Sequence, residues 1–297
     1  MEAVNMELQW PLVVFTTFIC LSAGTFGFIS VASMKKEYAR IQLPGLITAF
    51  AALVIGGLAS VLHLQTPARY FGQFGNITSG INQELIALGL VAITMVVYFV
   101  RLRRKGDVGR AVKVVSALLS VVLVLVMSHS YMMASMPAWN TILLPLYYLL
   151  DAASLGALVM ALLMAVCTED DTACSKAIVV AIAAVVLLAL AVVAFAVFFC
   201  SLAGAGYTQA MHVDLLTVPP VDPASIGERM LSGDLAMLFW GGVVAVGLVL
   251  PLAALVVSRK APRASVGATA TAVVLVLLGG LAFRALLYCA GASLLVY

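Results

Sequence analysis

The feature that most constrains this chain is a series of long apolar segments that recurs along the whole sequence. Each has about 18 or more residues and few charges, which is enough for a helix to cross the ~30 Å hydrocarbon core of a bilayer. Eight such segments are present, at approximately 10–34, 43–64, 82–101, 112–133, 141–167, 175–202, 235–257 and 265–296. The pattern predicts an all-α integral membrane protein, an eight-helix bundle forming one membrane domain over 1–297.

The composition agrees with this prediction. Hydrophobic residues make up 64% of the chain and charged residues 10%, whereas soluble domains contain about 25% charged residues. Two glutamates and no basic residue precede the first apolar segment, the reverse of a secretory signal peptide, so we expect that segment to be retained.

Lysine and arginine placement predicts the topology, because cytoplasmic loops of membrane proteins collect positive charge. Of the 16 basic residues, 13 fall on one predicted side. We therefore expect both termini on the outer side of a bacterial inner membrane and four basic hairpins in the cytoplasm. The net charge of +3 then reflects contact with the lipid bilayer and gives no indication of nucleic-acid binding. The 13 residues are Lys35, Lys36, Arg40, Arg101, Arg103, Arg104, Lys105, Arg110, Lys113, Lys176, Arg259, Lys260 and Arg263.

Ionisable side chains inside the predicted spans are few, and such groups are costly enough at membrane depth to indicate a site or an internal pair. In the predicted topology, His63, Glu84, His129 and Arg284 all lie toward the outer end of their helices. His63 and Glu84 stand on consecutive helices joined by one loop. Asp151 lies well inside the fifth span.

These residue types suit the oxidation of a hydroquinone. A histidine near its unperturbed pKa of about 6.5 can take a proton from a phenolic hydroxyl, and a carboxylate can accept or relay the second proton. An arginine can stabilise the charge that develops. The sequence thus predicts a quinol pocket at the outer face, with His63 and Glu84 catalytic and with Arg69, His129, Tyr131 and Arg284 as further contacts.

Each residue also has a simpler interpretation. His63 and Arg69 could be interfacial residues near lipid headgroups, and Glu84 could be a helix N-terminal acid close to a capping Ser79. His129 could face the bundle interior, and Asp151 could pair with Arg284.

The sequence offers few ligands for a redox cofactor that could hold electrons within the chain. A b-type haem needs two axial ligands, usually two histidines on facing helices, and the only histidines are His63, His129 and His212. The five cysteines form no C-x-x-C pair and give no iron–sulfur or zinc pattern. We expect no haem and no metal in this chain, so its electrons must pass to a redox centre in a partner.

Several local motifs occur in an order that resembles one known family, the membrane anchor subunits of dimethyl sulfoxide reductase (DmsC). The resemblance covers nearly the whole chain. Its marks are Trp10-Pro11-Leu12 with Phe15-Thr16, Ala59-Ser60 to Leu62-His63-Leu64 with Pro67 and Arg69, Asn82 to Glu84, Tyr131 through Pro137 to Trp139, and Arg284 with Tyr288.

The resemblance implies a heterotrimer in anaerobic respiration. Its members would be a molybdopterin catalytic subunit, a four-cluster iron–sulfur subunit and this anchor, which would oxidise menaquinol and pass the electrons on. By the same resemblance, menaquinol binding falls on His63 and Glu84. Asp151 has no counterpart in the family pattern, and segment 203–234 is a candidate contact surface for a partner.

Three alternatives stay open from the sequence. The same site run in reverse would reduce quinone for a dehydrogenase. A proton- or ion-coupled secondary transporter would use Asp151 and Arg284 as a buried pair, although the repeats and broken helices typical of transporters are not evident. A purely structural anchor would give His63 and Glu84 no chemical role.

Overall fold

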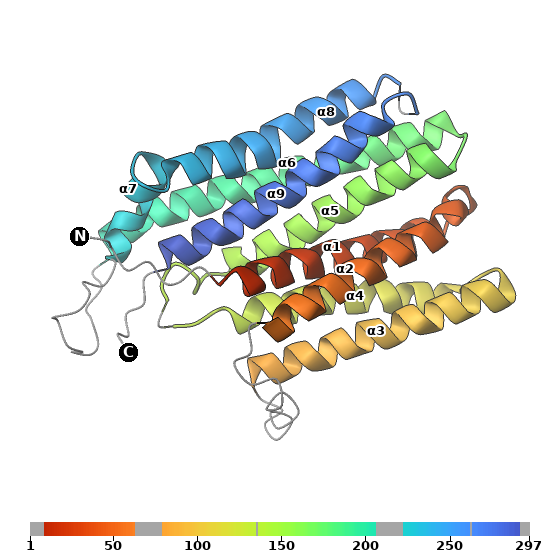
Figure 1. Cartoon of the computed structure of the whole chain (residues 1–297), viewed down its shortest axis with the longest axis horizontal. Coiled ribbons are helices and arrows are strands. Elements are labelled where there is room, and N and C mark those ends of the chain that lie inside the picture. The colour runs from red at the N-terminus through yellow and green to blue at the C-terminus, as the bar shows by residue number, and fades with distance from the viewer. Residues whose placement is uncertain (1–8, 63–78, 135, 206–221, 262, 292–297) are drawn as a thin grey trace.

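The computed structural model describes residues 9–62, 79–134, 136–205, 222–261 and 263–291, and this part of the chain contains helices and turns but no strand (Figure 1). Within it, eight helical segments are long and apolar enough to cross a membrane. The predicted all-α, eight-span fold is therefore confirmed. The segments are α1 (Trp10–Ala32), α2 (Gln42–Leu62), α3 (Gly80–Lys105), α4 (Arg110–Ser130), α5 (Leu143–Cys167), α6 (Asp171–Ser201), η5 (Met237–Val249) continued by α8 (Leu250–Ser258), and α9 (Val266–Ala290).

Local sequence signals explain several helix ends. Pro11 occupies the first turn of α1, where its missing N–H leaves no helical bond unmade. The Asp170 carboxylate caps α6 by accepting hydrogen bonds from the backbone N–H groups of Thr172 and Ala173, each at 3.0 Å. Gly106 ends α3 with a φ of 71°, a left-handed conformation that costs glycine little.

Helix α1 lies at the centre of the bundle and packs against α2, α4, α5 and α9. Its closest approach is to α5, where Gly24 faces Ala152 and Gly156 and the two backbones are in contact. A side chain at either glycine would overlap the backbone of the other helix. Small residues at such a crossing replace the hydrophobic driving force that is missing between helices in lipid.

The seventh span is wider than an ordinary α-helix along η5. Its last turn bonds the Leu250 N–H to the Ala245 carbonyl, five residues back, and Pro251, which has no N–H to donate, follows at the start of α8. Wide turns of this kind keep backbone groups paired where a bilayer offers no water. Gly247 in η5 contacts Gly279 in α9 backbone to backbone.

The two ends of the bundle differ in charge. α1 begins and α9 ends at one end, which we call the terminal end, and the hairpins α1–α2, α3–α4, α5–α6 and α8–α9 lie at the other, the basic end (Figure 1). The basic end carries 13 of the chain's 16 lysines and arginines. This separation agrees with the predicted topology, while the side of the membrane that each end faces stays a prediction.

The described part of segment 203–234 includes a short helix, α7 (Ile226–Leu231), at the terminal end. Gly227 packs on the backbone of Cys200 in α6. Arg229 forms an ion pair with Asp234 at 2.7 Å and reaches the Cys289 carbonyl of α9 at 3.5 Å. This part of the segment is therefore fastened to the bundle, and its predicted contact with a partner stays a prediction.

Candidate functional site

Glu84 lies in the second turn of α3 at the terminal end and points into the protein. Its side chain is 8% exposed, and Ser130, at the end of α4, lies beside its carboxyl. Ser79 is at the N-cap of α3 but makes no side-chain capping bond. Glu84 is therefore not a solvated N-terminal acid, and the simpler interpretation of this residue does not apply.

The linker between α4 and α5 closes over the same end of the bundle. Trp139 donates a hydrogen bond of 2.9 Å from Nε1 to the Leu287 carbonyl of α9. Its ring meets Tyr288 edge-on, with the ring centroids 5.0 Å apart, and meets Tyr131 in the same manner at 6.4 Å. The linker thereby joins the end of α4 to the end of α9.

Two oxygen atoms in this region are buried without a hydrogen-bond partner among the described residues, Glu84 Oε1 and Tyr288 Oη. The two side chains lie within electrostatic range of each other. An unpaired buried polar group costs about 1–3 kcal/mol, so such groups mark a place where a ligand or another polar group fits. Hydroxyl groups, as on a quinol, fit both atoms, because a carboxylate accepts and a phenol donates or accepts.

Tyr131 forms the C-cap of α4 and borders Glu84. Burial raises the pKa of its hydroxyl well above the usual range, and the nearby Glu84 carboxylate adds to that shift. Tyr131 therefore stays protonated throughout the physiological pH range. It can donate a hydrogen bond but does not supply a base.

Arg284 is placed one helical turn before Tyr288 on α9, about 6 Å deeper in the bundle. It is 1% exposed, and its Nη2 lies 2.9 Å from Oδ2 of Asp151, which is 0% exposed. The predicted pairing of Asp151 with Arg284 is confirmed. Neither Asp151 oxygen makes a well-directed hydrogen bond, so charge attraction is the main component of the contact.

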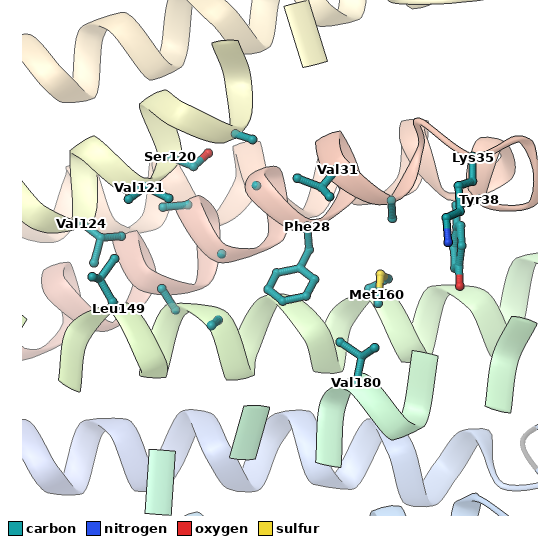
Figure 2. Close-up of a pocket in the computed structure, with 17 residues that line it drawn as sticks. Phe28, Val31, Lys35, Tyr38, Ser120, Val121, Val124, Leu149, Met160 and Val180 are labelled. Carbon is teal, nitrogen blue, oxygen red and sulfur yellow. The ribbon is translucent and has the colours of Figure 1, made fainter. Parts of the chain in front are cut away.

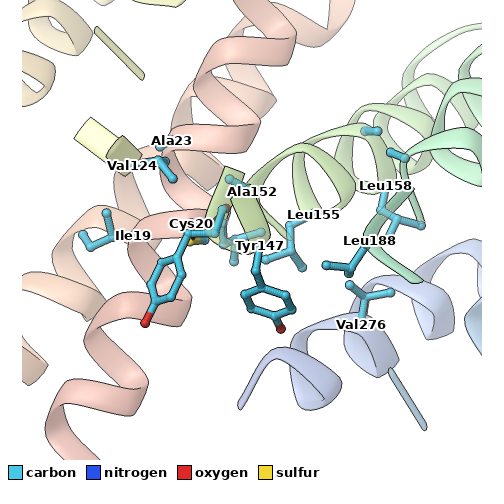
Figure 3. Packing of buried hydrophobic residues seen from close by; sticks show 14 of the residues in the cluster. Ile19, Cys20, Ala23, Val124, Tyr147, Ala152, Leu155, Leu158, Leu188 and Val276 are labelled. Carbon is cyan, nitrogen blue, oxygen red and sulfur yellow. Dashed lines mark hydrogen bonds between the residues drawn. The ribbon is translucent and has the colours of Figure 1, made fainter. Parts of the chain in front are cut away.

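The remaining contacts of Arg284 lock it in place. It donates to the Gly280 carbonyl at 3.1 Å, its Nη2 lies 3.1 Å from Cys20 Sγ, and its Cζ stands 4.7 Å from the centroid of the Tyr148 ring. Figure 3 shows the surrounding core, in which Cys20 lies on α1 and Tyr147 points from α5 toward α9. Arg284 thus belongs to a buried cluster beneath Glu84 and Tyr288, with its charge matched by Asp151.

The other predicted site residues are placed differently. His129, in the last turn of α4, is exposed and does not face the bundle interior. His63 and Arg69 lie outside the described residues, in the segment between Leu62 of α2 and Ser79 before α3. The end of α2 and the start of α3, which flank this segment, are both at the terminal end (Figure 1). The structure thus brings together Glu84 and Tyr131, with Arg284 one layer below.

Tyr288, Tyr148 and Trp139 were not assigned site roles from the sequence, although all three border this region; Tyr288 was noted only as a mark of the family resemblance. Tyr148 stands three residues before Asp151 on α5, a spacing that places both on one helix face, so a buried Asp151 already indicated it. Trp139 carried no such signal, because its position depends on how an irregular linker folds across α9.

The bundle, with eight segments long and apolar enough to span a membrane, defines a polytopic membrane protein. The sequence profile of one family, described as DMSO reductase anchor subunit (DmsC), matches residues 5–290. The chain therefore belongs to the DMSO reductase anchor subunit family, and the resemblance noted in the sequence is confirmed.

Two curated proteins are similar to this chain, and each is named as a chain of anaerobic dimethyl sulfoxide reductase. The protein from Haemophilus influenzae is 27% identical over 143 residues, which cover 46% of this chain and 51% of that protein. The protein from Escherichia coli K12 is 27% identical over 174 residues, which cover 56% of this chain and 61% of that protein. The matches span about half to three fifths of the length of these relatives.

Proposed function

We propose that this chain oxidises menaquinol at the terminal end of its bundle and passes the electrons to an iron–sulfur subunit of a dimethyl sulfoxide reductase-like complex. The observation that carries the proposal is the pair of buried, unpartnered oxygens, Glu84 Oε1 and Tyr288 Oη, in a member of an anchor-subunit family. A quinol hydroxyl would supply the missing hydrogen-bond partner to each.

Each residue has its own part in the chemistry. Oxidation of a quinol releases two electrons and two protons and leaves a quinone. His63 takes one proton as the two electrons leave, and Glu84 accepts or relays the other to water. Tyr288 and Tyr131 orient the ring by hydrogen bonding, and Arg69 stabilises the negative charge that develops on the quinol oxygen.

The electrons must leave the chain for a redox centre elsewhere. The sequence contains no cysteine motif for a cluster and too few suitably placed histidines for a pair of haems. The proposed partners are a four-cluster iron–sulfur subunit, docked at the terminal end, and a molybdopterin subunit that reduces the terminal acceptor. Arginines and lysines at the other end support the placement of the terminal end outside a bacterial inner membrane.

The test compares two electron donors to the complete membrane-bound complex. With Glu84→Gln, we expect turnover with menaquinol to fall by a factor of about 10²–10⁴, the usual contribution of a general base. Turnover with a reduced viologen dye, which donates directly to the partner subunits, should not change. Tyr288→Phe should show a smaller loss in the same assay.

Gln83 provides the matched control, because it is the neighbouring residue on α3 and is exposed. Gln83→Ala should leave both activities unchanged. Wild-type rates of menaquinol oxidation in Glu84→Gln would refute the proposal, and catalysis that proceeds only toward quinol formation would favour the quinone-reducing alternative.

A further inference from the structure

A cavity of about 440 Å³ lies away from the Glu84 region, between α1, α4 and α5. Figure 2 shows it extending from Val124 of α4 and Leu149 of α5 to Lys35 and Tyr38 at the basic end. Val31, on its rim, is 55% exposed. The cavity is therefore a groove that opens sideways, toward the surface that a bilayer covers.

The length of the groove matches one leaflet. It follows α1 from Ala23 to Ala32 and α5 from Leu149 to Met160, separations of nine and eleven residues, or about 14 and about 17 Å along a helix. Half of a ~30 Å hydrocarbon core is about 15 Å. The groove is therefore long enough for the part of one acyl chain that lies within a single leaflet.

Away from the mouth the lining is apolar apart from Ser120. Lys35 is its one charged lining residue among those that the structure describes, and Tyr38 stands beside it. Lys113 on α4, the neighbouring cation, is already engaged by Asp107 at 3.0 Å and by the Ser33 carbonyl at 2.9 Å. Lys35, by contrast, is exposed and has no ion-pair partner within the described part of the chain.

The charge around the mouth favours an anion. Lys36 and Arg40 follow Lys35 within one short segment that holds one acid, Glu37, beside the Tyr38 hydroxyl. A second acid, Asp170, lies within electrostatic range of Tyr38, so cations outnumber acids by three to two. Basic recesses between membrane helices on the inner side bind anionic lipid headgroups. A zwitterionic lipid also has a phosphate, but its own cation offsets the attraction, so it would gain less from these cations.

We propose that this groove is a binding site for one anionic phospholipid. An acyl chain lies along α1 between α4 and α5, and the headgroup phosphate contacts Lys35 at the basic end. The site is separate from the Glu84 region and does not depend on the quinol chemistry proposed for it.

Native mass spectrometry of the full-length chain, released from detergent with added phosphatidylglycerol or with phosphatidylcholine of the same acyl chains, tests the proposal. We expect one phosphatidylglycerol to be retained in preference to phosphatidylcholine. Lys35→Ala should weaken its binding about fivefold, the effect of one basic residue at a membrane surface. Lys36→Ala, one residue along the chain and outside the groove lining, should weaken binding less than Lys35→Ala does.

A second variant tests the acyl-chain half of the site. A Cβ atom at Gly27 would lie 3.4 Å from Ser120 Cβ, and Gly27 lines the groove, so we expect the side chain of Gly27→Val to fill part of it. It should abolish retention of the lipid. Gly89→Val on α3, where no atom lies within 4 Å of an added Cβ, is the matched control and should not.

Three results would overturn the proposal. Equal retention of the two lipids would show that headgroup charge plays no role in binding. Retention that neither Lys35→Ala nor Gly27→Val changes would show that the lipid binds outside the groove. A co-purified quinone lost from Gly27→Val in place of phospholipid would assign the groove to an isoprenoid tail.

Discussion

At the residue scale, the protein treats its buried ionisable groups in two ways. Asp151 and Arg284 neutralise each other at 2.9 Å inside the bundle. Glu84, one layer nearer the terminal end, keeps an oxygen without a partner among the described residues. The ion pair balances both of its charges within the protein, whereas the unpaired Glu84 oxygen is available to a ligand. We therefore expect the pair to be structural and to take no part in proton transfer.

Substitution of the buried pair tests this division. Asp151→Leu or Arg284→Met alone leaves one buried charge uncompensated, and we expect each to lower the free energy of unfolding by about 3–5 kcal/mol. The double variant, which removes both charges, should recover most of that loss. Unfolding of the purified chain in detergent measures the effect.

The activity of the double variant separates a structural pair from a transport pathway. If the pair is structural, the double variant should retain menaquinol oxidation. A double variant that folds as stably as the wild type but has lost this activity would show that Asp151 or Arg284 acts in the chemistry.

At the element scale, α1 and α5 cross closely and form the core against which α9, the helix that carries Tyr288, packs. Gly24→Ala places a methyl group against the Ala152 backbone, and we expect a loss of stability of about 1–3 kcal/mol, as for overpacked cores. Gly57→Ala in α2, where nothing lies within 4 Å of the added carbon, should leave stability unchanged or raise it slightly. Thermal unfolding of both variants in detergent measures the difference, and equal melting temperatures would contradict the close crossing.

At the scale of the whole molecule, the spans followed from composition because apolar length alone dictates a membrane helix. Sequence and structure differ mainly at the ends. The eighth span was expected to run to 296, whereas α9 ends at Ala290 and residues 292–297 lie outside the described part. The seventh was expected to begin at 235, whereas η5 begins at Met237, after α7.

The site was only partly accessible from the sequence. The cost of a charge at membrane depth singled out Glu84 and Arg284, and the order of the helices placed both toward one end. How deeply Arg284 lies within that end was not predictable. Its depth depends on how α9 is rotated about its axis, and the observed rotation buries Arg284 against Asp151. The contacts of Trp139 could not be predicted either, because it lies in an irregular linker whose sequence has no helical periodicity.

The orientation of the whole bundle follows from the basic end, and a reporter fused to the C-terminus tests it. An alkaline phosphatase fusion, active only outside the cytoplasm, should be active, whereas a fusion within the α3–α4 hairpin should be inactive. Activity of the hairpin fusion alone would reverse the proposed orientation and place the Glu84 region on the cytoplasmic side.

The most direct test of the central claim is to locate the quinone on the protein. A photoreactive menaquinone analogue, cross-linked to the membrane-bound complex and mapped by peptide mass spectrometry, should label the start of α3 near Glu84, the α4–α5 linker and the end of α9 near Tyr288. Excess menaquinone should displace the label, and Glu84→Gln should reduce it. Displaceable label confined to the groove between α1, α4 and α5, or unaffected by Glu84→Gln, would contradict the claim.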